Sequence, residues 1–116
     1  MELADKLQIK PETTISVLAA PEHGPDLSGV GQPARNPAEA EAVIAFVQCS
    51  ADLAESPAVE AARLDKLTWI AYPKAGQLGT DLNRDSLAKA VHDLGIRPVR
   101  QVSLDDVWSA LRMRPA

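Results

Sequence analysis

The stretch around which the rest of the chain can be placed is Leu67-Thr68-Trp69-Ile70-Ala71-Tyr72-Pro73-Lys74. Its apolar, aromatic and β-branched residues predict a short buried strand. Pro73 is expected to end that strand, because proline lacks the N–H that donates a hydrogen bond in a sheet. Lys74 is then the first residue of the loop that follows. The loop contains Gly76 and Gly79 and leads into a helix. We therefore expect a strand–loop–helix unit with a lysine at its turn.

Two more strands are predicted upstream. Residues 14–18 are β-branched and apolar, and residues 42–47 form a continuous apolar run typical of a strand buried on both faces. Residues 21–40 are rich in Pro and Gly and lack periodicity, so we expect a long surface loop there. A short helix is expected over residues 2–7, where leucines recur four positions apart.

Two helical regions are predicted. Ser50 is expected to cap a helix that Pro57 interrupts, so that a short helix ends before Pro57 and a second begins with Pro57 in its first turn. After the Trp-containing strand, Thr80 or Asp81 is expected to cap a helix that runs through Leu94 and carries an apolar stripe.

The C-terminal part predicts an antiparallel pair of strands. Gly95 is expected to end the preceding helix. Residues 96–104 are extended, and Pro98 favours an edge position for them. The two aspartates at 105–106 predict a tight turn, so residues 107–113 must return as an antiparallel neighbour.

This order of elements predicts one α/β domain over residues 1–116. We expect a mostly parallel, five-stranded, Rossmann-like sheet flanked by helices and ending in a C-terminal antiparallel hairpin. The topology is similar to the back half of a class I methyltransferase sheet, which also ends in an antiparallel hairpin.

Composition and charge exclude several classes of protein and of binding site. No apolar run is long enough for a membrane span, and the acidic N-terminus lacks the layout of a signal peptide, which favours a cytoplasmic location. The single Cys49 excludes an internal disulfide and a Cys-cluster metal site. The net charge of -4 disfavours nucleic-acid binding.

A set of motifs runs through the chain: Leu7-Gln8-Ile9-Lys10-Pro11, Leu18-Ala19-Ala20-Pro21, Trp69-Ile70-Ala71-Tyr72-Pro73-Lys74, Thr80-Asp81-Leu82, Gly95-Ile96 and Val102-Ser103-Leu104-Asp105-Asp106-Val107-Trp108-Ser109-Ala110-Leu111. Together they resemble a family of small bacterial proteins of unknown function. The likeness covers nearly the whole chain and is weakest over residues 22–40. It implies the fold and a bacterial origin but brings no established activity.

The loop after the Trp-containing strand is a candidate ligand site. Ligands of open α/β sheets favour the carboxyl ends of strands, and residues 20–23, 49–50 and 72–74 should meet there. An ammonium group and a helix N-terminus both favour an anionic small molecule. The candidate ligand-binding residues are Tyr72, Lys74, Gly76, Gly79, Thr80 and Asp81. The alternative is that the lysine pairs with Asp81 or Asp85 at the surface, while the glycines serve the turn.

A basic patch is predicted on the final hairpin, which carries Arg97, Arg100, Arg112 and Arg114 in an acidic protein. Such a patch is suited to an acidic partner or a phosphate. The alternative is a solvated edge that discourages pairing between sheets.

We predict no catalytic residue and no metal ligand. Cys49 would need a base, for which His23 is the only nearby candidate, and a small buried hydrophobe is the favoured interpretation. Asp105 and Asp106 are expected to accept hydrogen bonds from backbone N–H groups in a turn. The two tryptophans are expected in the core.

No cofactor is expected, because no G-x-G-x-x-G follows the first strand. The favoured hypothesis is a non-catalytic binding or interaction module. The alternative is an enzyme, or the remnant of one, in which Lys74 clamps an anionic small molecule and Asp81 or Asp105 handles a proton. Convergence of Lys74, Asp81 and either Cys49 or His23 in one pocket would favour the enzyme. A homo-oligomer formed through a helix face stays open.

Overall fold

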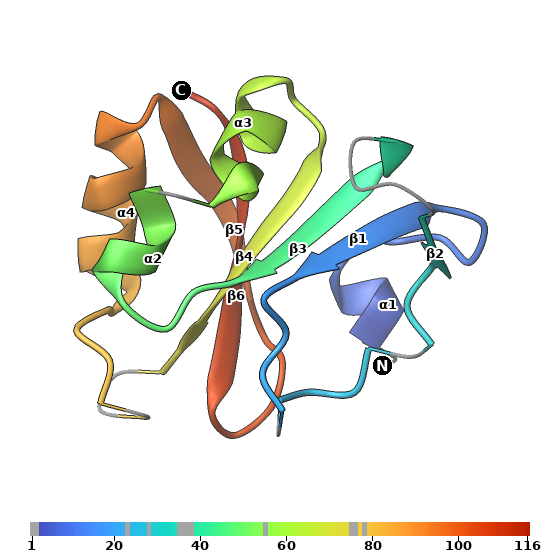
Figure 1. Cartoon of the computed structure of the whole chain (residues 1–116), viewed down its shortest axis with the longest axis horizontal. Coiled ribbons are helices and arrows are strands. Elements are labelled where there is room, and N and C mark those ends of the chain that lie inside the picture. Colours follow the sequence, from blue (N-terminus) through green and yellow to red (C-terminus); the bar gives the residue numbers. More distant parts are fainter. Residues whose placement is uncertain are drawn as a thin grey trace.

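A computed structural model describes residues 3–22, 24–27, 29–34, 39–54, 56–74, 77 and 79–116. One six-stranded sheet, in the order β2-β1-β3-β4-β6-β5, organises them (Figure 1). The strands are β1 Thr14–Leu18, β2 Gln32–Pro33, β3 Ala42–Phe46, β4 Leu67–Pro73, β5 Ile96–Ser103 and β6 Trp108–Pro115. The helices are α1 Leu3–Lys6, α2 Ser50–Ala54, α3 Pro57–Arg63 and α4 Arg84–Asp93.

The sheet is mixed, so the prediction of a mostly parallel, five-stranded sheet is wrong. Strands β2, β1, β3 and β4 pair in parallel, whereas β6 is antiparallel to both β4 and β5. The predicted C-terminal antiparallel pair is confirmed, and β5 lies at the edge as Pro98 indicated. Burial explains the order of these two strands. Residues 108–111 of β6 are all buried, whereas most of β5 is not, so β6 takes the inner position.

The sixth strand lies inside the predicted long loop. Strand β2 is held by hydrogen bonds from Gln32 N to Thr13 O (2.8 Å) and from Ala34 N to Ile15 O (2.9 Å). Both residues of β2 are exposed, so no apolar pattern marks it in the sequence. The loop also contributes to the core, because Val30 is buried.

The two faces of the sheet are covered differently. Helices α2, α3 and α4 pack on one, which we call the three-helix face (Figure 1). On the other, the α1 face, α1 and the segments around Ile9 and Val30 pack against residues of β1, β3, β4 and β6. Trp69 is fully buried there, and its indole Nε1 donates to Leu7 O at 2.9 Å. Trp108 is also buried, stacking edge-on with Phe46, so the prediction of core tryptophans is confirmed.

The helix boundaries follow local signals, with two corrections. Ser50, predicted to cap α2, is the first residue of that helix. Ser56 caps α3 and Pro57 occupies its first turn, as predicted. Helix α4, however, is capped by Asn83 and not by Thr80 or Asp81. Asn83 and Ser86 form a reciprocal capping box, with hydrogen bonds of 2.9 Å in both directions.

Apolar contacts explain why the cap lies at Asn83. Leu82 and Leu87 flank the first turn of α4, and both are buried in the three-helix core. This pair forms a hydrophobic staple that fixes the entry of the chain into the helix. The other end is as predicted, with Gly95 at a φ of 87° directly after the C-cap. None of the helices in the described residues is long and apolar enough to cross a membrane.

Candidate functional site

A hollow of about 360 Å³ opens on the three-helix face, where the end of β4 meets the start of α4 and the β5–β6 pair. It is lined by Tyr72, Lys74, Asn83, Arg84, Gln101 and Ser109. Strand register brings these residues together. Tyr72 lies opposite Ser109, and Gln101 lies opposite Leu111, whose side chain belongs to the three-helix core.

Lys74 is held in place at this hollow. Its backbone N–H donates to Val107 O at 2.7 Å, which extends the pairing of β4 with β6 by one residue. Its ammonium Nζ donates to Ser103 Oγ at 2.9 Å, and that hydroxyl donates in turn to Asp105 O at 3.2 Å. An ammonium has three donors, and Ser103 takes one of them. The lysine is therefore positioned, half-buried, with hydrogen-bonding capacity left for a ligand.

Tyr72 supplies a neutral hydroxyl at the floor of the hollow. Its side chain is 2% exposed, and its hydroxyl accepts a hydrogen bond from Gln101 Nε2 at 3.2 Å. Burial raises the pKa of Tyr72 above its ordinary value, while the charge of Arg84 and a hydrogen bond with Ser109 act in the opposite direction. The phenol therefore stays protonated at neutral pH and is able to donate a hydrogen bond.

The electrostatics of the hollow favour a negative charge. Two cations, Lys74 and Arg84, line it, and among the lining residues that the structure describes there is no Asp, Glu, His or Cys. The N-terminal end of α4 adds the positive end of a helix dipole. Within the described ranges, no group of three or more His, Cys, Asp or Glu side chains is placed to hold a metal ion. The arrangement is able to bind an anion.

The predicted ligand-binding residues separate into two groups. Tyr72 and Lys74 line the hollow, whereas Gly79, Thr80 and Asp81 lie in the connection to α4, outside its lining. Gly79 has a φ of 65° with nothing near its missing Cβ, so it serves the turn. Thr80 Oγ1 accepts from Leu82 N at 3.0 Å. Gly76 lies outside the described residues.

Four lining residues were missed by sequence reasoning: Asn83, Arg84, Gln101 and Ser109. A signal existed for the first two, because Leu-Asn-x-x-Ser-Leu at residues 82–87 is a staple with a capping box. The other two reach the hollow through the pairing of β6 with β4 and β5. That placement depends on β6 lying between those strands.

A second hollow, of about 390 Å³, lies at the carboxyl ends of β1 and β3. The ends of β1, β3 and β4 do lie side by side, as predicted. The lining is chiefly apolar and includes Asp52, whose Oδ2 accepts from Gln48 N at 3.2 Å. Neither Lys74 nor Cys49 is among its lining residues.

The convergence that would favour an enzyme is not found among the described residues. Lys74 lines one hollow, whereas Asp81 and Cys49 line neither of the two, and His23 lies outside the described ranges. Asp105 serves the hairpin turn as predicted, with Oδ1 accepting from Val107 N at 2.8 Å and Trp108 N at 2.7 Å.

The predicted arginine patch lies away from the Lys74 hollow. Arg112 is paired with Trp69 across β6 and β4, and residues directly opposite one another share a face of a sheet. Trp69 belongs to the α1 face, so Arg112 and its neighbours point away from α4. The two predicted sites are thus separated by the sheet.

No protein-family profile matches the chain, and no curated protein or solved structure is significantly similar to it. The resemblance to a family of small bacterial proteins therefore stays a prediction.

Proposed function

We propose that the chain is a small non-catalytic binding domain whose Lys74 hollow takes a small anionic ligand. One observation carries the proposal. Lys74 and Arg84 converge on a hollow whose other polar groups, including the buried Tyr72 hydroxyl, are neutral. An open hollow of this kind attracts an anion, and none of its described lining residues is a carboxylate, histidine or cysteine that could accept a proton from it.

The lining residues indicate the class of ligand. A volume of about 360 Å³ suits a small metabolite. The planar guanidinium of Arg84 is able to hold a carboxylate or a phosphate through two hydrogen bonds, and Lys74 acts as a point charge. Tyr72 and Ser109 then supply neutral hydroxyl groups that orient the ligand.

The enzyme alternative needs an acid beside Lys74. Asp105 already accepts two backbone hydrogen bonds through Oδ1, and Asp81 lies outside the lining of the hollow. Binding without catalysis therefore has the better support. A cytoplasmic location, a bacterial origin and a Rossmann-like relationship belong to this proposal on the strength of the sequence features given above.

A thermal-shift screen tests the proposal. The compounds are inorganic phosphate, pyrophosphate, nucleotides, phosphorylated sugars, di- and tricarboxylates and S-adenosylmethionine. A ligand at about 100 times its dissociation constant adds roughly 2.7 kcal/mol to stability, which raises the melting temperature measurably. We expect at least one phosphate or carboxylate to do so.

The variants Lys74→Ala and Arg84→Ala should lose this shift. Lys89→Ala removes an equal charge from α4 at an exposed position outside the hollow, and it should keep the shift. The proposal is wrong if no anion shifts the wild-type melting curve, or if Lys74→Ala and Lys89→Ala respond alike.

A further inference from the structure

The four arginines of the final hairpin form one surface, which we call the arginine face: Arg97, Arg100, Arg112 and Arg114. Arg97 lies directly opposite Arg114, and Arg100 lies directly opposite Arg112. A register shift between Pro98 and Arg100 allows this. Without such a bulge, two residues three positions apart on a strand would point to opposite faces. All four side chains therefore share the α1 face.

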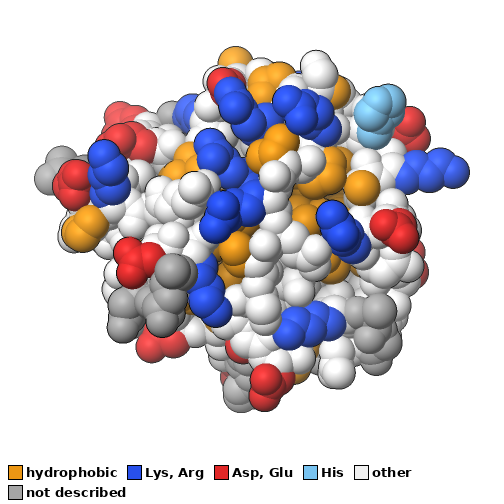
Figure 2. All heavy atoms as spheres, turned by 180° about the vertical axis from the view of Figure 1, so that it is seen from behind, with side chains coloured by type: hydrophobic (Ala, Val, Ile, Leu, Met, Phe, Trp, Pro, Cys, Tyr) orange, Lys and Arg blue, Asp and Glu red, His pale blue; other side chains and the backbone are white. Residues whose placement is uncertain are grey.

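Helix α1 leaves the arginine face largely open. Leu3 and Ala4 of α1 pack against the core of the α1 face, and Arg112 Nη1 donates to Gln8 Oε1 at 3.0 Å. Figure 2 shows one side of the molecule on which Lys and Arg side chains gather over the middle, with hydrophobic side chains between them and most acidic ones toward the margin. Positive charge is thus concentrated locally in a protein with a net charge of -4.

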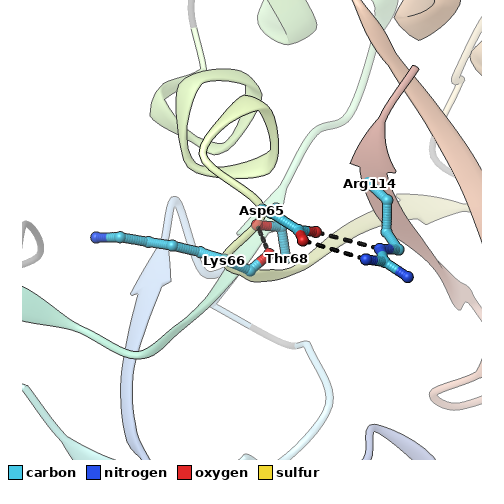
Figure 3. A network of polar contacts seen from close by, with 4 residues as sticks. All are labelled: Asp65, Lys66, Thr68 and Arg114. Carbon is cyan, nitrogen blue, oxygen red and sulfur yellow. Dashed lines mark hydrogen bonds and ion pairs between the residues drawn. The ribbon is translucent and has the colours of Figure 1, made fainter.

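One arginine of this face already holds a carboxylate. Arg114 Nε and Nη2 each lie 3.1 Å from an oxygen of Asp65, in a bidentate pair (Figure 3). Asp65 occupies the left-handed position after the C-cap of α3, with a φ of 60°. That position favours glycine, and an aspartate there is conformationally costly. The chain itself therefore shows the carboxylate geometry that the face accepts.

The other three arginines have donors to spare. Arg97 and Arg100 form no side-chain hydrogen bond or ion pair with the described part of the chain. Arg112 donates a side-chain hydrogen bond to the neutral Gln8 and its charge also acts on Asp65, while its Nε is buried without a hydrogen-bond partner in the described structure. Like charges directly opposite each other destabilise a sheet. The arginine face therefore offers N–H donors for which the described residues supply no acceptor.

From these observations we propose that the arginine face docks an extended, acidic segment of a partner protein, an interaction that goes beyond the ligand of the Lys74 hollow. Arg112 and Arg114 are two residues apart on β6, a rise of about 6.8 Å along a strand. An extended segment with an acid at every second residue repeats its carboxylates at the same interval. Each cross-strand arginine pair then meets one carboxylate.

Two features favour a protein segment over a nucleic acid. All the aromatic side chains are buried, so none is available for stacking bases. The overall charge of -4 also repels a long polyanion. By contrast, the half-buried Val102 and the exposed Val99 lie on the same strand as Arg97 and Arg100, and they offer apolar contact to the alternate residues of a peptide.

The test uses the full chain and a fluorescein-labelled ten-residue peptide that alternates Glu and Val, with a Gln–Val peptide as its uncharged match. Fluorescence anisotropy should show about tenfold tighter binding of the Glu peptide. The double variant Arg97→Glu/Arg100→Glu should lose about tenfold or more of that affinity. Lys10→Glu/Lys89→Glu makes the same change in net charge at exposed positions off the face, and should bind within about threefold of wild type.

Two further arms keep the test decisive. Asp65→Asn keeps a side chain that tolerates the left-handed backbone but frees Arg114, so it should bind the Glu peptide several-fold more tightly. Arg97→Gln/Arg100→Gln removes the charges without adding acids, in case the reversal variant fails to fold. Equal losses in the two reversal variants, no gain in Asp65→Asn, or tighter binding of duplex DNA than of the Glu peptide would each overturn the proposal.

Discussion

Successive side chains of strand β6 point to opposite faces of the sheet, and the two surfaces that they form differ in character. Leu111 and Met113 point to the three-helix face and are buried in its core. Arg112 and Arg114, between and beyond them, point to the α1 face, where they meet Gln8 and Asp65. The strand therefore separates a closed, apolar surface from an open, charged one.

Helix coverage accounts for the difference. Helix α4 brings the fully buried Leu87 and Val91 onto the three-helix face, so only apolar or neutral groups fit beneath it. Charged side chains on this face are found where α4 begins, because Lys74 and Arg84 line the hollow there. On the α1 face, β5 lacks such a cover among the described residues, and the arginines collect there. A small-ligand site and a docking surface thus share one hairpin.

The largest effect should come from Leu111→Ala. The side chain is 2% exposed, and its loss leaves a cavity beneath the helices, which typically costs about 2–5 kcal/mol. Arg97→Ala, on the open face of the same hairpin, should change stability by about 0.5 kcal/mol or less. Urea unfolding of both variants provides the measurement. Similar costs for the two would mean that the faces are not packed differently.

A smaller effect is expected at the start of α4. Asn83→Ala removes the N-cap side chain and should cost about 1 kcal/mol in urea unfolding. It should also weaken anion binding, because Asn83 and Arg84 both line the hollow. Thr80→Ala serves as the control, since Thr80 makes a turn contact but does not cap the helix. A larger loss in Thr80→Ala would place the cap where the sequence alone suggested it.

The smallest effect concerns Asp65 and pH. Its hydrogen bonds with Arg114 lower the pKa of this carboxyl below 3.8. A lowered pKa in the folded state contributes stability that is present above pH 3.8 and lost as the pH falls through the folded value. The pair is exposed, so this contribution is small. Asp65→Asn should melt slightly below wild type at pH 7, and the difference should vanish in acid. A difference independent of pH would contradict the role of the ion pair.

Much of the fold could be predicted because its signals are local. The tight turn at Asp105, the edge position of Pro98 and the restart of a helix at Pro57 each depend on neighbouring residues. The position of β6 between β4 and β5 depends on which strand gains more from burial, and that comparison spans the whole sheet. Strand β2 has only two residues, both exposed, and carries no pattern to find.

The candidate sites were predictable to a similar degree. Tyr72 and Lys74 were identified because they end a strand, and the arginines because they cluster in sequence. Arg84, Gln101 and Ser109 were not, because cap position and strand register bring them to the hollow. The sequence alone does not indicate that Arg97 and Arg100 share a face, because residues three positions apart on a regular strand point to opposite faces. The bulge after Pro98 brings them to the same face.

The central claim is that a small anion binds at the Lys74 hollow and not at the arginine face. The most direct test is an NMR titration of the ¹⁵N-labelled chain with the anion that raises the melting temperature most. We predict saturable amide shifts at Lys74, Arg84 and Gln101 that disappear in Lys74→Ala. Shifts confined to Arg97 and Arg112, or unsaturable shifts spread over all basic residues, would contradict the account.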